Sequence, residues 1–286
     1  MGAVDGTSAW SPHLDDSRVR EVLVRNRRLR EVLPVGEVDS TQDAASASVA
    51  DGARDGTVVL ADRQLAGRGR SGRVWDDDRD GGTLALTVIL DASAMAATVA
   101  LTPHAFGLAV VAAAGVVVPA AVIPTLKWPN DVVVRSAEDG RLRKLAGILI
   151  ERQKVVDRDV LLCGIGLNVD LRGPLLPPDR ICLASLTGAS PVRPVLLASL
   201  LAALDAVIVR LVDAPRALLA DYRTRCETIG RTVEVTLPGG RRVVGRAMGV
   251  DDEGRLVVAG ADGTEAILAG TIRDAVGLPS GREEHR

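Results

Sequence analysis

The most informative stretch of this sequence is Gly67-Arg68-Gly69-Arg70-Ser71-Gly72-Arg73, with Trp75 close behind it. Its three glycines let the backbone turn sharply and approach a ligand closely. Its three arginines present planar guanidinium groups that match phosphate or carboxylate oxygens. A segment that is both flexible and cationic suits a cover over an anionic ligand better than a core element. Taken alone, it also fits an exposed basic surface loop.

Two familiar nucleotide-binding motifs must be weighed against this stretch. Gly67, Gly69 and Gly72 fit the spacing G-x-G-x-x-G, and Asp91 follows about 20 residues later. A dinucleotide-binding loop must open a helix, however, and residues 76–82 are acidic and glycine-rich, which is typical of a loop. A Walker A loop needs Lys followed by Ser or Thr, where this chain has Arg73-Val74. Neither motif is therefore predicted.

The composition indicates a globular protein rather than a nucleic-acid binder. The chain has 286 residues, with 35 Lys and Arg against 37 Asp and Glu, a formal net charge of -2. A dedicated nucleic-acid binder usually carries a basic excess, so DNA binding is not expected. The scattered cysteines Cys163, Cys182 and Cys226 predict a cytoplasmic protein without a cysteine metal site.

One segment is apolar enough to be considered for a membrane span. Residues 105–123 carry no charge and are long enough to cross a bilayer. They are rich in alanine, contain Pro119, and are followed closely by Lys127 and Asp131. A buried core helix over 102–117 is the better prediction, and the N-terminus shows no signal-peptide pattern.

The distribution of strands and helices predicts an α+β fold with several regions. Residues 1–33 are expected to form a tail and one helix, which is too short for a winged-helix DNA-binding domain. Residues 34–226 form the predicted catalytic domain, a mixed or antiparallel sheet flanked by helices. Its expected strands are 34–38, 57–61, 84–90, 126–134, 145–152 and 160–168, and its expected helical segments are 102–117 and 194–225.

The residue pattern of the sequence changes near Gly230. Short alternating runs over 232–237, 241–250, 255–259 and 265–268 are separated by glycine-containing turns. This spacing is typical of a small β-barrel, which we predict over 227–277. Residues 278–286 are expected to be a disordered tail.

Further motifs place polar groups at strand ends. Lys127-Trp128-Pro129-Asn130-Asp131 must break a strand or lie on an edge, because proline cannot donate to a sheet ladder. Lys144 opens the apolar run Leu145 to Ile150. Glycines in Gly164-Ile165-Gly166-Leu167-Asn168 indicate that a ligand or another backbone lies against this strand. Asp39-Ser40-Thr41-Gln42 opens a helix, where Ser40 also suits a plain N-cap.

In this order and spacing, the motifs resemble one family, the bacterial biotin protein ligases, also called biotin–acetyl-CoA-carboxylase ligases. The resemblance covers about residues 35–275 and is to the form without an N-terminal DNA-binding domain. It implies the class II synthetase-like biotin/lipoate ligase fold, followed by an SH3-like β-barrel. It also implies that biotin is activated with MgATP to biotinyl-5′-AMP, with release of pyrophosphate. The biotinyl group then passes to one lysine of a biotin carboxyl carrier protein.

The resemblance also assigns roles to individual residues. The implied catalytic residues are Lys144, Arg70 and Asp131. The implied biotin-binding residues are Ser40, Thr41, Gln42, Gln64, Arg68, Gly69, Arg70 and Lys144. The implied ATP and adenylate contacts are Arg70, Arg73, Trp75, Lys127, Asn130 and Asn168. Mg²⁺ arrives with ATP, so no protein metal ligands are implied. Asp131 is the candidate that deprotonates the acceptor lysine, whose ordinary pKa is about 10.4, although a purely orienting role stays open.

Some features keep alternatives open. Gln42 stands where an Asn is common in the family, and Ser71 stands where a basic residue is common. A lipoate or octanoate ligase of the same fold, a biotin-responsive regulator and a catalytically inactive adenylate-binding module are the rival functions. Edge strands near Lys127 or Val160 could pair with another chain, so a homodimer also stays open.

Overall fold

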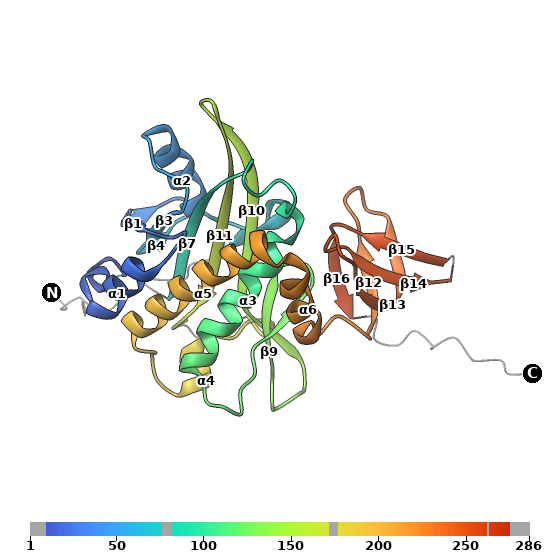
Figure 1. Ribbon diagram of the computed structural model, residues 1–286. Coiled ribbons are helices and arrows are strands. Elements are labelled where there is room, and N and C mark those ends of the chain that lie inside the picture. Colours follow the sequence, from blue (N-terminus) through green and yellow to red (C-terminus); the bar gives the residue numbers. More distant parts are fainter. Residues whose placement is uncertain (1–9, 76–81, 172–176, 262, 275–286) are drawn as a thin grey trace, which may run out of the picture.

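The computed structural model describes residues 10–75, 82–171, 177–261 and 263–274, and a seven-stranded sheet forms its centre (Figure 1). The strands in spatial order are β1 (Glu31–Pro34), β3 (Thr57–Ala61), β7 (Thr83–Asp91), β11 (Arg158–Asn168), β10 (Leu142–Val155), β9 (Asp131–Arg135) and β8 (Thr125–Lys127). The β1–β3 pair is parallel and the other neighbouring pairs are antiparallel. The predicted mixed sheet is therefore confirmed.

Helices cover one face of this sheet and build the main core. Helix α3 (Thr102–Val117) packs on β8 to β11 and on α5 (Arg193–Asp213), which in turn contacts α1 (Ser17–Arg25) and α6 (Pro215–Arg225). Alternate residues of each strand face this layer, as in Leu84, Leu86 and Val88 of β7. Helical segments 99–117 and 193–213 are each long and apolar enough to cross a membrane by length and composition. In this structure the two helices pack against each other. A helix that is apolar on all sides is found in the core of a soluble protein as well as in a membrane.

The opposite face of the sheet is only partly covered. Helix α2 (Thr41–Ala50) packs there on a small second core that includes Ala45, Val59 and Leu162. Two short ladders lie beside it: β2 (Glu37–Val38) pairs with β4 (Arg63–Gln64), and β5 (Gly67–Arg68) pairs with β6 (Val74–Trp75). The candidate site lies on this face, between α2 and strands β10 and β11.

The C-terminal strands form a separate antiparallel sheet, consistent with the expected SH3-like domain (Figure 1). Its strands, in the order β15 (Gly263–Ile267), β14 (Leu256–Gly260), β13 (Arg242–Val250), β12 (Thr232–Thr236) and β16 (Thr271–Asp274), all pair antiparallel. Trp128 ties this domain to the large one: its indole N–H donates to the Gly254 carbonyl (3.1 Å) and its backbone N–H to the Thr228 hydroxyl (3.0 Å).

The expected N-terminal elements were partly wrong. The expected strand 34–38 is split into β1 and β2, because Gly36 takes a left-handed conformation (φ 60°) and turns the chain between them. Strand β1 begins at Glu31, inside the segment expected to be a tail and helix. The helix ends at Arg25, and beyond it the Asp205 carboxylate accepts the backbone N–H groups of residues 27–29.

The expected helical segment 194–225 is two helices, α5 and α6, broken at Ala214. Pro215 occupies the start of α6, where a missing N–H costs nothing. The break expected around Trp128-Pro129 is confirmed, since it separates β8 from β9 and β8 is an edge strand. The acidic run 76–78 and the predicted tail 278–286 lie outside the described residues.

A buried histidine makes the fold sensitive to acid. His104 of α3 is 3% exposed and stacks edge-on against Tyr222 with ring centroids 4.3 Å apart. Burial lowers the pKa of His104 from 6.5 to about 4, and the backbone at Ala100 and Gly254 opposes only part of this shift. Neither ring nitrogen has a hydrogen-bond partner of good geometry among the described residues.

We expect the free energy of unfolding to fall as the pH drops from about 6.5 to about 4. Over that range the unfolded chain binds a proton at His104 and the folded chain does not, which lowers the free energy of unfolding by roughly 2 to 3 kcal/mol by about pH 4.5. Urea unfolding of the wild type and of His104→Phe at about pH 7.5 and about pH 4.5 measures this. The variant should lose less stability on acidification; equal losses would contradict the assignment.

Candidate active site

The floor of the candidate site is a patch of bare backbone on β10 and β11. Gly147 pairs directly with Gly166, and Leu149 pairs with Gly164. Because side chains alternate along a strand, Gly164 and Gly166 face away from the core side chains of Cys163 and Ile165. A Cβ atom on Gly166 would lie 2.5 Å from the Trp75 ring, and one on Gly147 would lie 2.9 Å from it. The indole of Trp75 therefore rests directly on the strands.

Trp75 belongs to the glycine- and arginine-rich stretch, which forms a small hairpin over this floor. We call Gly67–Trp75 the flap. Gly67 pairs with Trp75, the Gly69 N–H donates to the Arg73 carbonyl (2.7 Å), and a 3₁₀ turn, Arg70–Gly72, closes the tip. The flap lies over the floor, its backbone is joined by its own hydrogen bonds, and its role as a cover for a ligand stays a prediction.

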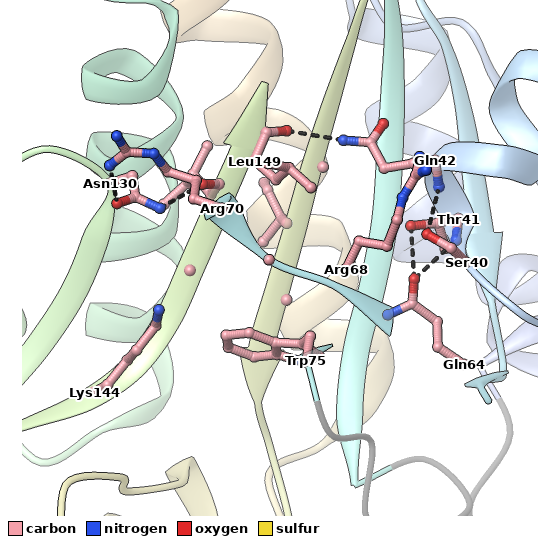
Figure 2. A pocket seen from close by; sticks show the side chains of 16 residues that line it. Ser40, Thr41, Gln42, Gln64, Arg68, Arg70, Trp75, Asn130, Lys144 and Leu149 are labelled. Atoms are coloured by element: carbon pink, nitrogen blue, oxygen red, sulfur yellow. Dashed lines mark hydrogen bonds between the residues drawn. The ribbon is translucent and has the colours of Figure 1, made fainter. Parts of the chain in front are cut away.

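The start of α2 forms a polar end of the pocket (Figure 2). Ser40 caps the helix by accepting the Gln42 N–H (3.2 Å). The Thr41 N–H and hydroxyl donate to Gln64 Oε1 at 2.8 and 3.0 Å, and the Thr87 hydroxyl donates to that of Thr41 (2.9 Å). This chain of bonds holds Thr41 and Gln64 in fixed orientations, as a site that recognises a polar ring requires.

Gln42 has a bracing role that its place in the sequence did not indicate. Its side-chain Nε2 donates to the carbonyls of Leu149 (3.0 Å) and Leu162 (3.3 Å), so it joins β10 and β11 beside the pocket. A Cβ on Gly164 would lie 3.0 Å from the same nitrogen. The Oε1 atom of Gln42 is buried and has no partner among the described residues.

The other end of the pocket is charged. Lys144 Nζ lies 2.6 Å from the Asp131 carboxylate and 5.2 Å from the centroid of the Trp75 ring. The β9–β10 register shifts between Lys144 and Ala146, which is a β-bulge. Bulges re-aim the side chains they carry, and Figure 2 shows Lys144 directed into the pocket from β10.

Arg70 reaches the same end from the flap. Its guanidinium donates to Asn130 Oδ1 (3.0 Å), and Asn130 Nδ2 donates to the Ile148 carbonyl (2.7 Å). Burial lowers the pKa of Arg70 from its ordinary value, Asp131 opposes the shift and Arg73 adds to it. An arginine stays charged at neutral pH, so this end holds a partly desolvated cation that an anionic ligand would stabilise.

Asn168 lies behind Lys144 rather than in the pocket wall. It is fully buried at the end of β11, and its Nδ2 donates to the carbonyls of Lys144 (3.2 Å) and Ile181 (3.0 Å). Its Oδ1 is buried without a partner among the described residues. The amide thus fixes the backbone that carries Lys144 and retains one acceptor.

The remaining predicted residues lie around the rim. Arg68 pairs with Asp43 (3.0 Å) and Glu151 (2.9 Å) across the mouth, and Arg73 donates to the Thr271 hydroxyl of the C-terminal domain (3.1 Å). Lys127 lines a wider cleft that opens from the pocket toward β16. Among the described residues, no cluster of three or more His, Cys, Asp or Glu side chains could hold a metal ion.

The structure brings most of the predicted residues into one pocket of about 440 Å³, counted with its open mouth. Those that line it are Ser40, Thr41, Gln42, Gln64, Arg68, Gly69, Arg70, Trp75, Asn130 and Lys144. The adjoining cleft adds Arg73, Lys127 and Asp131. Sequence reasoning missed Arg180, whose guanidinium lies 5.8 Å from the Trp75 ring centroid, because nothing in its local sequence distinguishes it.

Comparison with known proteins gives the class of this protein, a ligase, and its family. The model of the biotin/lipoate A/B protein ligase family matches residues 35–168, and that of the biotin protein ligase C terminal domain matches residues 228–273. The chain belongs to the biotin/lipoate protein ligase family.

Individual relatives show which members of this family the chain is similar to. The chain is 36% identical over 274 residues to the biotin--[acetyl-CoA-carboxylase] ligase of Mycobacterium tuberculosis, covering 91% of this chain and 96% of that protein. It is 28% identical to the bifunctional ligase/repressor BirA of Bacillus subtilis, covering 82% and 71%. The biotin protein ligase from Aquifex aeolicus in complex with biotin and ATP superposes with a TM-score of 0.74 at 26% identity, covering 86% and 100%.

The close contact between the strand glycines and Trp75 predicts the effect of adding one methyl group to the floor of the pocket. Gly166→Ala should displace the Trp75 ring, because the new Cβ would lie 2.5 Å from it. We expect an altered tryptophan emission spectrum with unchanged far-UV circular dichroism. Gly249→Ala is the matched control, since it also lies within a strand and a Cβ there meets nothing within 4 Å. An unchanged Gly166→Ala spectrum would contradict the packing described.

Proposed function

We propose that the protein is a biotin protein ligase that forms biotinyl-5′-AMP from biotin and MgATP and transfers biotin to a carrier-protein lysine. One observation carries this proposal above the others. A single pocket joins a fixed polar end, Thr41 with Gln64, to a cationic end, Lys144 with Arg70, across a floor of bare backbone. This shape suits a small molecule with a polar ring, an apolar tail and a carboxylate.

In the proposed first step, the cationic end brings two anions together. The carboxylate of biotin must attack the α-phosphate of ATP, and the repulsion between them has to be offset. Lys144 and Arg70 stand where both groups would meet, and they stabilise the charge that develops on the phosphoryl oxygens. Ser40, Thr41, Gln42 and Gln64, with the backbone at Arg68 and Gly69, would hold the ring of biotin.

The nucleotide would occupy the wider cleft beside Trp75. Arg73, Lys127 and Asn130 line this cleft together with Arg180. Asn168, which the family resemblance assigns to the adenylate, is fully buried behind Lys144, and in this proposal it holds the backbone that carries Lys144 instead of touching the nucleotide. Mg²⁺ would enter with the phosphates of ATP.

In the proposed second step, an acceptor lysine attacks the biotinyl carbonyl and AMP leaves. The acceptor must first lose a proton. Asp131 is the candidate base, and its ion pair with Lys144 (2.6 Å) supports this assignment. The partner would be the biotin carboxyl carrier domain of a carboxylase, met in the cytoplasm.

The rival functions receive less support. The M. tuberculosis relative, whose length the chain matches almost fully, bears a biotin ligase name, which favours biotin over lipoate or octanoate. A regulatory role would require DNA binding, and the net charge of -2 offers no general attraction to DNA. An operator gel shift tests the regulator, and sedimentation with and without biotin and ATP tests a homodimer.

The direct test is incubation with ATP, Mg²⁺, biotin and a carrier domain. Mass spectrometry should show the carrier heavier by one biotinyl group, on one lysine. Lipoate and octanoate serve as competing acids in parallel reactions. Modification with either of these and not with biotin would replace the proposed function.

Lys144→Ala should lose biotin-dependent pyrophosphate release by a factor of about 10² to 10³, the usual cost of removing one group that stabilises developing charge. The rate of pyrophosphate formation with saturating biotin and ATP measures it. Lys154→Ala is the control, because it removes the same charge farther along the same strand. Activity near that of the wild type would exclude Lys144 from catalysis.

Arg70→Gly should still form the adenylate but hold it poorly, because the flap loses its bond to Asn130 and a cation beside the phosphate. Released biotinyl-AMP reacts with exposed amines, so bystander proteins should be labelled. Streptavidin blots of reactions that contain serum albumin measure this. A variant that labels the carrier domain alone would refute the prediction.

A further inference from the structure

The wider cleft beside the pocket is strongly cationic. It opens from the candidate active site toward β16 and encloses about 1490 Å³, counted with its open mouth. Of the described side chains that line it, six are Lys or Arg, and two, Asp131 and Asp179, are carboxylates. This excess of positive charge suits a ligand that carries several negative charges.

Arg180 reaches this cleft from the chain that follows β11. Its backbone runs parallel to β10 and pairs with Lys144 in an isolated bridge. The Lys144 N–H donates to the Asp179 carbonyl (2.6 Å), and the Ile181 N–H donates to the Lys144 carbonyl (3.0 Å). The Asn168 amide joins the carbonyls of Lys144 and Ile181. The backbone of Arg180 is therefore fixed directly beside that of Lys144.

The side chains of Arg180 and Lys144 approach the same aromatic ring. Directly paired residues of neighbouring strands direct their side chains to the same face. Lys144 Nζ lies 5.2 Å and the Arg180 guanidinium 5.8 Å from the centroid of the Trp75 ring. Both distances lie within the range of a cation–π contact, about 6 Å. Two cations from paired backbone positions thus stand beside Trp75.

The two cations differ in the cavities that they line. Lys144 lines both the pocket and the wider cleft, as Arg70 does, whereas Arg180 lines the cleft and not the pocket. In the proposed function, Lys144 and Arg70 mark the junction where the carboxylate meets the α-phosphate. Arg180 lies beyond that junction, on the side of the nucleotide.

We propose that Arg180 binds the β- and γ-phosphates of ATP, the part of the nucleotide that leaves as pyrophosphate. This inference rests on the proposed function for the identity of ATP as the substrate. A guanidinium can bind phosphate oxygens through two parallel hydrogen bonds. Lys144 and Arg70 stay with the reacting carboxylate and α-phosphate, so Arg180 offsets charge on the leaving group.

Arg143 offers a matched control. It precedes Lys144 in β10, its guanidinium pairs with Glu138 (3.4 Å) and Asp139 (3.6 Å), and it is not among the residues that line the cleft. Arg143→Gln and Arg180→Gln each remove one positive charge close to Lys144, so they share any long-range electrostatic effect. Urea unfolding compares the stabilities of the two variants.

Binding of α,β-methylene-ATP, which cannot release pyrophosphate, measures the contact directly. This analogue and AMP are titrated by calorimetry in the presence of biotin. Arg180→Gln should bind the analogue about tenfold more weakly, because a hydrogen bond between charged groups is lost, and AMP within about twofold of the wild type. Arg143→Gln should bind both ligands within about twofold of the wild type.

Steady-state kinetics separate this contact from those at the reacting atoms. In Arg180→Gln, KM for ATP should rise about tenfold and pyrophosphate should inhibit about tenfold more weakly. KM for biotin should stay within about twofold, since Arg180 does not line the pocket. Arg180→Lys keeps the charge and loses the planar fork, so its KM for ATP should lie between those of the wild type and Arg180→Gln.

The inference is overturned if Arg180→Gln binds the analogue as the wild type does, or loses no more affinity than Arg143→Gln. Equal losses for the analogue and for AMP also overturn it, since they assign Arg180 to the adenosine or the α-phosphate. So does a wild type that does not bind the analogue. Failure of the proposed function has a different signature: the wild type would bind the analogue but release no pyrophosphate from ATP with biotin.

Discussion

The close contact between the Trp75 indole and the backbone of Gly147 and Gly166 organises the whole site. No side chain other than hydrogen leaves room for an aromatic ring on that face of β10 and β11. The ring closes one side of the pocket and anchors the end of the flap, whose arginines then lie over the charged end. Helix α2 reaches the neighbouring part of this face through Gln42 beside Gly164, so the pocket lies between that helix and the Trp75 ring.

The charged end depends on backbone irregularity at Lys144. A bulge interrupts the β9–β10 ladder at this residue, and the Asn168 amide together with the segment around Ile181 bonds the exposed backbone. The backbone groups of Lys144 are thus hydrogen-bonded by Asp179, Ile181 and Asn168. The lysine is held rigidly beside Asp131, while Arg70 arrives from the flap. Lys144 on the sheet and Arg70 on the flap suit a reaction in which two anions are brought together and water is then excluded.

The two domains and the N-terminal segment all converge on this site. Trp128, next to the Asn130–Asp131 pair, is bound through its backbone to Thr228 and through its indole to Gly254. Arg73 of the flap reaches Thr271 in the C-terminal domain. On the N-terminal side, the backbone N–H of Trp10 donates to the carboxylate of Asp62, two positions before the pocket residue Gln64. The pocket is therefore supported by chain segments that are distant in sequence.

Local sequence determined the elements and the chemistry of this protein. Period-two alternation located the central strands, the apolar run located α3, and proline marked the break at Trp128–Pro129, since these signals act between near neighbours. The motifs supplied the residue types of the site and their family resemblance.

Tertiary structure decided which groups those side chains meet. It turned Gln42 and Asn168 into braces, paired Arg68 with Asp43 and Glu151, and added Arg180. Such roles depend on contacts between residues up to 120 positions apart along the chain, for which local spacing carries no signal.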